Sequence, residues 1–536
     1  MSANQATLDP NRNPAEFRIG SIIVPLLAII AGVFMVILDA TAMNVALSSL
    51  VHDFDAPLSR LQWTVTGYML AQASVIPLSG WLSDRFGAKR VFLVSVVLFT
   101  VGSALCALPN SAEWLILFRV IQGLGGGCVL PVAMAYVYRL SPPEKVGVVM
   151  GMMGVPILFA PAIGPVLSGW LVEFHSWRWI FLINIPIGLI CLWVGLRRLP
   201  KIDKQRVATI DVPGIILGPL AFAALSYGVS EGAHGWSSAK TLTGLIVGGI
   251  ALILFIFVEL RSKTPLLELR VFRSLDFSAG IIVQWIAQFA LYGALFLMPQ
   301  FLQQARGFEP FDTGLTLLPQ ALASGLMMPI AGMLFDKIGV RWLVVAGLGL
   351  VSGALYQYSH VDLTTQRVDL ILPLLMCGAG MGMMMMPMNS HLISKAPRDL
   401  VSRVTSLTNA MQQVISSLAV ATLVTILTSR TATKLTELQS AAGGAGAAAG
   451  GGASSAGSAG AGAAAGAAKG TAATPEAQAA FMEAMVHGFR ETFHVMIFIA
   501  IAGALLGLVL RRGKKPGAQE ARDGKGKGEE AVLMHG

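Results

Sequence analysis

Two stretches of sequence, GWLSDRFGAKR at residues 80–90 and GMLFDKIGVR at residues 332–341, share the pattern G-x-L-x-D-[RK]-x-G-x-[KR]. They begin 252 residues apart, and each stretch joins two long hydrophobic segments. A motif that recurs in corresponding loops indicates that the chain was built by duplication of one half. We therefore expect two related bundles of helices.

The composition of the chain is that of an integral membrane protein. Hydrophobic residues make up 54% of the 536 residues and charged residues only 12%, and the mean hydropathy is +0.68. A helix of about 20 apolar residues crosses a bilayer core of roughly 30 Å. Fourteen such stretches occur, centred on 22–49, 63–82, 91–108, 114–138, 147–171, 179–196, 212–229, 241–260, 277–301, 313–335, 342–358, 370–394, 404–428 and 490–510. The sequence predicts an all-α protein with fourteen transmembrane helices.

Lys and Arg residues concentrate in alternate loops, which predicts the orientation of the chain. Cytoplasmic loops carry the excess of basic residues, so both termini are expected in the cytoplasm. The polar N-terminal segment lacks the features of a cleaved signal peptide, so the first helix is expected to be retained. The expected organisation is a cytoplasmic tail (1–21), a six-helix bundle (22–199), two extra transmembrane helices with linkers (200–276), a second six-helix bundle (277–511) and a disordered cytoplasmic tail (512–536).

One segment of the second half has an unusual composition. Residues 440–474, within an expected periplasmic loop at 430–488, are almost entirely Ala, Gly and Ser. Such a segment contains too few large apolar residues to fold alone, so a flexible linker is expected. A docking site for a periplasmic partner is the alternative.

Several other classes of function are disfavoured by the sequence. The net charge of +9 is spread over loops and the C-terminal tail, unlike the single basic stripe of a nucleic-acid-binding protein. The four cysteines lie in apolar helices without metal-ligand spacing and are expected to be buried thiols. No phosphate-binding loop or hydrolase motif is present. The sequence therefore predicts neither an enzyme nor a metal or cofactor site.

The duplicated loop has a chemistry that suits a gate. Gly87 and Gly339 permit a tight reversal of the chain, while Asp84 and Asp336 can meet basic side chains or the N-terminus of a neighbouring helix. Such pairs hold one conformation closed. The alternative is that basic loops here mark topology only. The candidate gating residues are Gly80, Asp84, Arg85, Gly87 and Arg90 in the first copy, and Gly332, Asp336, Lys337, Gly339 and Arg341 in the second.

A carboxylate interrupts the first hydrophobic segment. Asp39, in the stretch LDATAMNVAL at 38–47, and Arg119 are the two charges of the first half expected well inside the membrane. A charge at the bilayer centre costs roughly 2.5–3.5 kcal/mol on insertion scales, so a retained one usually has a function. We hypothesise that Asp39 binds a transported proton or a cationic substrate and that Arg119 tunes its affinity. A structural ion pair between the first and fourth helices is the alternative.

These motifs together resemble those of the major facilitator superfamily. The loop at 80–90 resembles the signature between helices two and three, and LILFRVIQGLGGG at 115–127 resembles the fourth-helix motif, with Arg119 followed by Gln122 and Gly123. The segment GVPILFAPAIGPVLSGW at 154–170 resembles the antiporter motif, with the motif residues Pro161, Gly164, Pro165 and Gly169. Ala160 departs from the usual glycine but remains small.

The resemblance extends to one branch of the superfamily. LDATAMNVAL and WRWIFLINIPIG at 177–188 are similar to stretches of the fourteen-helix drug:proton antiporters of the EmrB/QacA type, whose two extra helices correspond to 212–229 and 241–260. This implies a proton-driven exporter of drugs or other hydrophobic compounds, multi-pass in a bacterial inner membrane. Relatives in bacteria with two membranes work with a periplasmic adaptor and an outer-membrane channel, which the resemblance implies as candidate partners. A dedicated exporter of one metabolite, fatty acid or siderophore would share the same motifs.

The expected substrate-lining residues lie mainly in the second half. Gln284, Gln288 and Tyr292 share one helix face, and Met385 belongs to the methionine-rich run GAGMGMMMMPMNSH at 378–391. Methionine is flexible and polarisable, which suits unlike apolar ligands, although ordinary packing is an equal alternative. Gln122 of the first half completes this set. The second half offers no clear mid-membrane acid, which favours neutral, anionic or monocationic substrates.

Overall fold

The computed structural model describes residues 19–141, 145–200, 211–232, 235–262, 265–394, 400–441 and 475–510. Most of both expected tails and most of the Ala/Gly-rich segment lie outside these residues. The described chain is helical throughout, with no strand.

The first half begins with α2 (Ile19–Phe54) and the short α3 (Leu58–Leu61). The second expected span is two helices, since Pro77 follows the end of the first and lacks a backbone N–H. The remaining helices follow the expected spans closely. The full set is α4 (Trp63–Val75), α5 (Leu78–Phe86), α6 (Ala88–Cys106), α7 (Ala112–Leu140), α8 (Val146–Phe174), α9 (Arg178–Leu182) and α10 (Asn184–Arg198).

Two further helices precede the second half, α11 (Val212–Glu231) and α12 (Ala239–Arg261), and a 3₁₀ turn, η4 (Leu269–Arg273), leads into it. The first helix of the second half ends in a π-helical turn that begins two residues after Pro299. The second half consists of α13 (Leu275–Gln300) with η5 (Phe301–Ala305), α14 (Pro310–Ile338), α15 (Val340–Tyr358), α16 (Arg367–Ser394), α17 (Val401–Ala441) and α19 (Pro475–Gly507).

Twelve helices of the described chain are long and apolar enough to cross a bilayer. The two remaining expected spans, at 63–82 and 147–171, are occupied by α4 with α5 and by α8. Two helices extend furthest beyond their expected ends. α17 continues 13 residues past the predicted end at 428, and α19 begins 15 residues before the predicted start at 490. Polar helix-forming residues continue α17 outside the apolar span, where Lys434 donates to Glu437.

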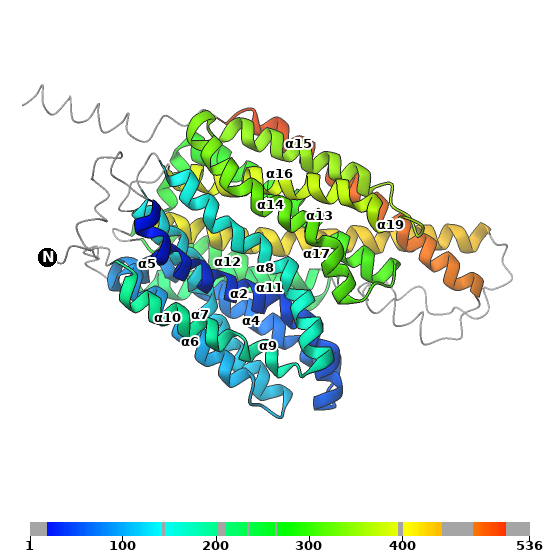
Figure 1. Ribbon diagram of the computed structural model, residues 1–536, viewed down its shortest axis with the longest axis horizontal. Helices are drawn as coiled ribbons and strands as arrows, with labels where there is room; N and C mark the ends of the chain where they lie inside the picture. The colour runs from blue at the N-terminus through cyan, green and yellow to red at the C-terminus, as the bar shows by residue number, and fades with distance from the viewer. Residues whose placement is uncertain are drawn as a thin grey trace, which may run out of the picture.

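The two copies of the repeated motif make similar close contacts across the two halves. In Figure 1, most of the first half, from α2 to α7, lies below the green to orange helices of the second half, with α8 packed against α14. Gly80 of α5 lies against the Ser402 carbonyl of α17, and Gly332 of α14 lies against the Gly147 carbonyl of α8. Each motif glycine thus permits a close approach to the opposite half.

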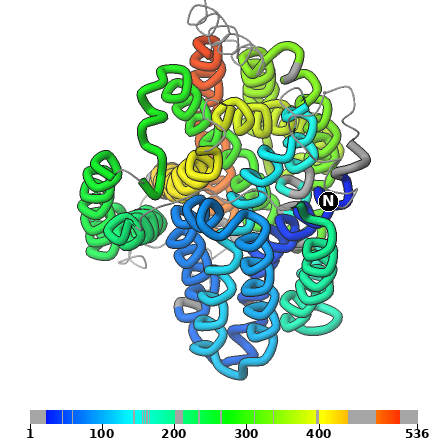
Figure 2. The backbone as a smooth tube through the Cα atoms, turned by 90° about the vertical axis from the view of Figure 1, so that its left-hand side faces the viewer, coloured from blue at the N-terminus to red at the C-terminus, as the bar shows by residue number. Residues whose placement is uncertain are grey.

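The extra pair α11 and α12 packs on the side of this two-bundle structure, where Figure 2 shows it as a separate green pair. α11 contacts α4 of the first half and α17 of the second. Trp63 of α4 stacks on Tyr227 of α11 with ring centroids 6.2 Å apart, and Trp236 donates to Thr425 of α17 at 2.9 Å. The extra helices therefore cover the seam between the halves.

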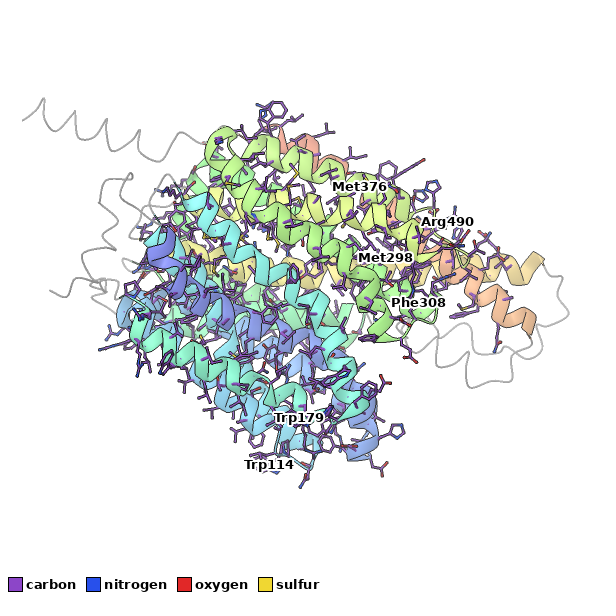
Figure 3. All side chains as sticks on the ribbon, viewed as in Figure 1. Trp114, Trp179, Met298, Phe308, Met376 and Arg490 are labelled. Carbon is purple, nitrogen blue, oxygen red and sulfur yellow. The ribbon has the colours of Figure 1, made fainter. Side chains whose placement is uncertain are left out.

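The two ends of the molecule differ in composition. One end, which we call the basic end, carries Arg85, Arg139, Arg197, Arg273 and Lys337. The opposite end carries aromatic residues, of which Trp114, Trp179 and Phe308 are labelled in Figure 3, and the two tryptophans are exposed. Exposed tryptophans are typical of membrane–water interfaces. All four cysteines are buried, as predicted.

Candidate functional site

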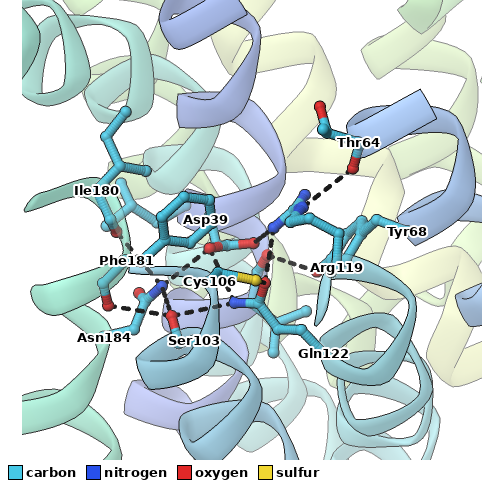
Figure 4. A network of polar contacts seen from close by, with 12 residues as sticks. Asp39, Thr64, Tyr68, Ser103, Cys106, Arg119, Gln122, Ile180, Phe181 and Asn184 are labelled. Carbon is cyan, nitrogen blue, oxygen red and sulfur yellow. Dashed lines mark hydrogen bonds and ion pairs between the residues drawn. The ribbon is translucent and has the colours of Figure 1, made fainter. Parts of the chain in front are cut away.

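Four helices of the first half converge on the carboxylate of Asp39. Asp39 lies near the middle of α2, and Arg119 lies about 10 Å from the start of α7 at 1.5 Å per residue. α6 supplies Ser103 and α10 begins with Asn184. Figure 4 shows these side chains pointing toward one another in the interior.

Both carboxylate oxygens of Asp39 accept hydrogen bonds from buried donors. Arg119 Nη1 lies 2.5 Å from Oδ2, and neither side chain has exposed surface. Gln122 Nε2 donates to Oδ1 at 3.1 Å and Asn184 Nδ2 donates to the same atom at 2.9 Å. The ionised form of Asp39 therefore has one counter-ion and two neutral hydrogen-bond donors. These partners offset the free-energy cost of burying a charge.

The guanidinium of Arg119 is held from several sides. Its Nε donates to the Thr64 carbonyl at 3.1 Å, and Nη1 also donates to Gln122 Oε1 at 2.8 Å. Its Cζ lies 4.0 Å from the ring centroid of Tyr68, a cation–π contact. Within the described chain, Nη2 has no hydrogen-bond partner. A proton added to Asp39 would neutralise the carboxylate that faces this fixed, buried cation.

A second layer of contacts orients the donors. Ser103 Oγ accepts from both Gln122 and Asn184, at 3.1 and 2.9 Å, and donates to the Phe181 carbonyl at 3.0 Å. This network spans α2, α6, α7, α9 and α10. Hydrogen bonds link Asp39 directly to α7 and α10, and through Gln122, Asn184 and Ser103 to α6 and α9.

The antiporter motif of α8 lies beside this network. Asp39 lines a cavity of about 10 Å³ together with Leu167, Ser168 and Ile180, enough space for no more than about one water molecule. Gly164 faces Thr41 of α2, and a Cβ at this position would overlap the Thr41 hydroxyl. Gly164 is thus required for the close packing of α8 on α2 at Thr41, which lies two residues after Asp39 in the chain. The side chains of Pro161 and Pro165 lie outside the described set, and Gly169 faces Phe311 of α14.

The first copy of the duplicated loop forms a charge cluster at the basic end. Asp84 Oδ1 accepts from Arg139 of α7 at 3.1 Å, and Asp84 Oδ2 accepts from Arg403 of α17 at 3.2 Å. Asp84 has no exposed surface. Next to it, the hydroxyl groups of Ser79 and Ser406 lie 2.7 Å apart. These contacts fasten α5 of the first half to α17 of the second, and we call them the latch.

The other loop residues behave differently from Asp84. Gly87 and Gly339 have φ angles of 92° and 79°, so both loops reverse as predicted. Arg85 lies over the ring of Trp81 and Arg341 over that of Trp342. Arg90 and Lys337 are exposed, and the side chain of Asp336 lies outside the described set. Among the charged residues of the first loop, Asp84 is thus the one whose described contacts reach the opposite half, through Arg403.

The residues expected to line a substrate path meet in the second half. Gln284, Gln288 and Met385 line one cavity of about 10 Å³, too small for a drug in this conformation. Gln284 and Gln412 both donate to Asn389 Oδ1, at 2.9 and 3.2 Å, and Gln288 donates to Ser416 at 3.3 Å. Tyr292 is partly buried, and its hydroxyl faces the same serine. Gln122 instead belongs to the Asp39 network.

Several residues of these sites were not anticipated from the sequence. Asn184 is an isolated amide in the apolar run WRWIFLINIPIG, a signal that could have identified it as a candidate. Ser103, Thr64 and Asn389 carried no distinguishing pattern, since single polar residues are common in membrane helices. Arg403 lies among the basic residues of an alternate loop, so its sequence context indicates topology alone. No carboxylate with a described side chain is buried in the second half, in agreement with the sequence.

The fold and this buried charge pair define the class of protein. The chain matches the profile of the Major Facilitator Superfamily over residues 29–420, and it belongs to that superfamily of membrane transporters. It is 35% identical to the multidrug resistance protein B homolog of Mycobacterium tuberculosis over 395 residues, 73% of each chain. It is 33% identical to the lincomycin resistance protein LmrB of Bacillus subtilis over 415 residues, 77% of this chain and 86% of that one.

A solved structure supports the fold. The proton:xylose symporter XylE, bound to 6-bromo-6-deoxy-D-glucose, superposes with a TM-score of 0.59 at 15% sequence identity, covering 92% of this chain and 97% of that chain. The chain is therefore a multi-pass major facilitator transporter, and the two relatives described above are named for drug resistance.

Proposed function

We propose that this protein is a proton-driven exporter that moves drugs or other hydrophobic compounds out of the cytoplasm or inner leaflet in exchange for protons. In this proposal, fourteen helices cross a bacterial inner membrane and both termini are cytoplasmic. The basic end then faces the cytoplasm, in keeping with the positive-inside rule. Two six-helix bundles move about the bound substrate, and α11 with α12 form the additional pair.

The observation that carries the proposal is the fully buried carboxylate of Asp39. A proton carrier needs a group that is ionised in one state and neutral in another, inside a dry cavity. Asp39 has that location, and Arg119 supplies a fixed positive charge that competes with the proton. Gly164 of the antiporter motif contacts α2 close to Asp39. This contact supports a role for α8 in transmitting a change in the protonation of Asp39 to the rest of the protein.

The latch supports alternation between two conformations. With Asp84 paired to Arg403, α5 and α17 are fastened at the basic end, which corresponds to a cytoplasmic gate that is closed. Opening that gate requires these contacts to separate, because α5 and α17 belong to different halves. We infer that protonation and substrate binding at the centre shift the balance between the latched and unlatched forms.

The energy available from protons is sufficient for export. One elementary charge moving through about 100 mV releases roughly 2.3 kcal/mol, which sustains a concentration ratio on the order of fiftyfold. Substrate breadth is supported by the methionine and amide residues around Met385 and Gln284, which suit unlike ligands. The drug-resistance names of the relatives favour the same class of substrate.

A three-part pump with a periplasmic adaptor and an outer-membrane channel is part of the proposal. The adaptor is expected to co-purify with the chain after mild cross-linking. Full resistance conferred by this chain in a strain without adaptors would contradict this part alone.

The experiment that tests the proposal measures substrate and proton movement together in everted vesicles. A panel of fluorescent drugs is added after a pH gradient is established, and wild type is compared with Asp39→Asn at matched expression. We expect drugs to dissipate the gradient in wild type only. Glu113→Gln is the control, because Glu113 is an exposed carboxylate paired with exposed Arg60 on the same half.

Normal drug-stimulated proton flux in Asp39→Asn would show that Asp39 does not couple transport. A wild type that ignores every drug offered would favour the dedicated exporter of a single metabolite, fatty acid or siderophore.

A further inference from the structure

A large cavity lies outside the site already described, between the extra helices and the second half. Its volume is about 620 Å³, within the roughly 300–1,000 Å³ of small-molecule sites. Phe222 of α11 and Leu252 of α12 form one wall, and Trp285 of α13 and Met411 of α17 form the other. These walls are apolar, so the cavity suits a hydrocarbon chain.

The cavity reaches the surface at the basic end. Arg270 and Arg273 of the turn η4 contribute to its lining, and both side chains are exposed. Ile256 and Leu260 of α12 also line it and are 38% and 52% exposed, as expected for a wall that opens toward lipid. Because η4 follows the end of α12 and precedes α13, the two arginines lie at the level where membrane headgroups begin.

The polar groups around the cavity are all hydrogen-bond donors. Besides the two guanidinium groups, the lining includes the indole Nε1 of Trp285, which is buried and has no hydrogen-bond partner among the described residues. The lining residues include no carboxylate. Two buried acids, Glu259 and Glu268, lie close by in the chain, but neither lines the cavity, and Glu259 accepts from the backbone N–H of Leu267 at 3.4 Å. An occupant must therefore combine an apolar chain with a negatively charged or acceptor-rich head.

We propose that this cavity binds an anionic phospholipid of the surrounding bilayer, with an acyl chain between α12 and α17 and its phosphate at Arg270 and Arg273. Arg binds phosphate well because its planar guanidinium offers several donors in fixed directions. The bound lipid joins the extra pair to α13 and α17, beside the seam that α11 covers. It thus completes the packing of the extra helices against the second half.

The test measures lipid retention by the purified full-length protein, which is independent of transport. The protein is delipidated, titrated with phosphatidylglycerol or with phosphatidylcholine of the same acyl chains, and examined by native mass spectrometry. We expect one retained phosphatidylglycerol with about a 25-fold preference over phosphatidylcholine, since each basic side chain near an anionic headgroup contributes about 1 kcal/mol.

Two variants and one control distinguish lipid binding in this cavity from non-specific attraction of anionic lipids to basic side chains. The double variant Arg270→Gln/Arg273→Gln should lose the preference, and Leu252→Trp, which fills the cavity, should lose the retained lipid. Arg197→Gln/Arg198→Gln should keep both, because it removes two exposed arginines at the same end but away from the cavity.

A fluorescence measurement keeps the test valid if a variant folds poorly. Brominated phosphatidylglycerol should quench wild-type tryptophan fluorescence more than that of Trp285→Phe, because the indole lies in the cavity. Equal quenching of the two proteins, or equal retention of both lipids by wild type, would overturn the proposal. So would uptake of a hydrophobic drug at this cavity without any preference for anionic lipid.

Discussion

Arg403 of the second half donates its Nε to Asp84 of the first half at 3.2 Å, 319 residues away in the chain. Arg139 of α7 holds the other oxygen of the same carboxylate at 3.1 Å. Asp84 is thus shared between a helix of its own half and a helix of the opposite half. This buried carboxylate joins α5 to α17 at the basic end, and the proposed cytoplasmic gate can open only if that contact separates.

The first prediction concerns this latch. Asp84→Asn removes the negative charge that both arginines share, and breaking a buried pair in this way costs about 3–5 kcal/mol. The latched form should become less populated. A cysteine introduced as Ser406→Cys, a buried position within the latch, should react with a membrane-impermeant maleimide at least about tenfold faster when Asp84→Asn is added to the same chain.

The control for the latch is Arg90→Gln, which removes a charge from the same loop at an exposed position. It should leave the labelling rate within about twofold of the parent, since exposed charges contribute little. An unchanged labelling rate in Asp84→Asn would mean that the latch does not hold the two halves together.

The second prediction concerns the Asp39–Arg119 pair. Asp39→Asn and Arg119→Gln should each lower the thermal unfolding temperature, because each leaves a buried group without its charged partner. The double variant should be less destabilised than the sum of the two singles, by at least about 1 kcal/mol. Thermal unfolding of the wild type, both single variants and the double variant in detergent gives the interaction energy by a double-mutant cycle. Additive single effects would indicate that the two side chains do not interact in the folded protein.

The third prediction concerns Asn184, which donates to Asp39 and to Ser103. Asn184→Ala removes a hydrogen bond to a charged group, and such bonds contribute about 1.5–3 kcal/mol. Lower thermal stability and slower drug-stimulated proton flux are expected. Asn110→Ala is the matched control, since Asn110 is an exposed amide that accepts a hydrogen bond from Arg178. Similar losses in both variants would deny Asn184 any special role at the centre.

The fourth prediction concerns the approach of α8 to α2. Gly164→Ala introduces a methyl group that overlaps the Thr41 hydroxyl, and such overpacking costs about 1–3 kcal/mol. Transport should fall, and Thr41→Ala in the same chain should restore part of it by removing the hydroxyl. Gly169→Ala should be tolerated, because its nearest neighbour, Phe311 N, would lie 3.8 Å away. Equal loss in Gly164→Ala and Gly169→Ala would contradict the steric explanation.

The sequence by itself determined the features that depend on neighbouring residues. Runs of apolar residues fixed the helices, because an apolar span in lipid must satisfy its backbone hydrogen bonds internally. The repeated motif located both tight loops, and Gly87 and Gly339 adopt the positive φ angles that such a turn requires. The sequence also identified Asp39 and Arg119, since a charged residue in an apolar helix is evident whatever its partners are.

The tertiary structure alone decided which of these groups meet. Asp84 pairs with Arg139 and Arg403 and leaves Arg85 and Arg90 in its own loop, a choice that the motif does not contain. Asn184 reaches Asp39 across 145 residues of sequence. Such pairs depend on how each helix is rotated about its axis and packed against the others. That rotation is set by side-chain packing between distant segments, so hydropathy and local spacing do not determine it.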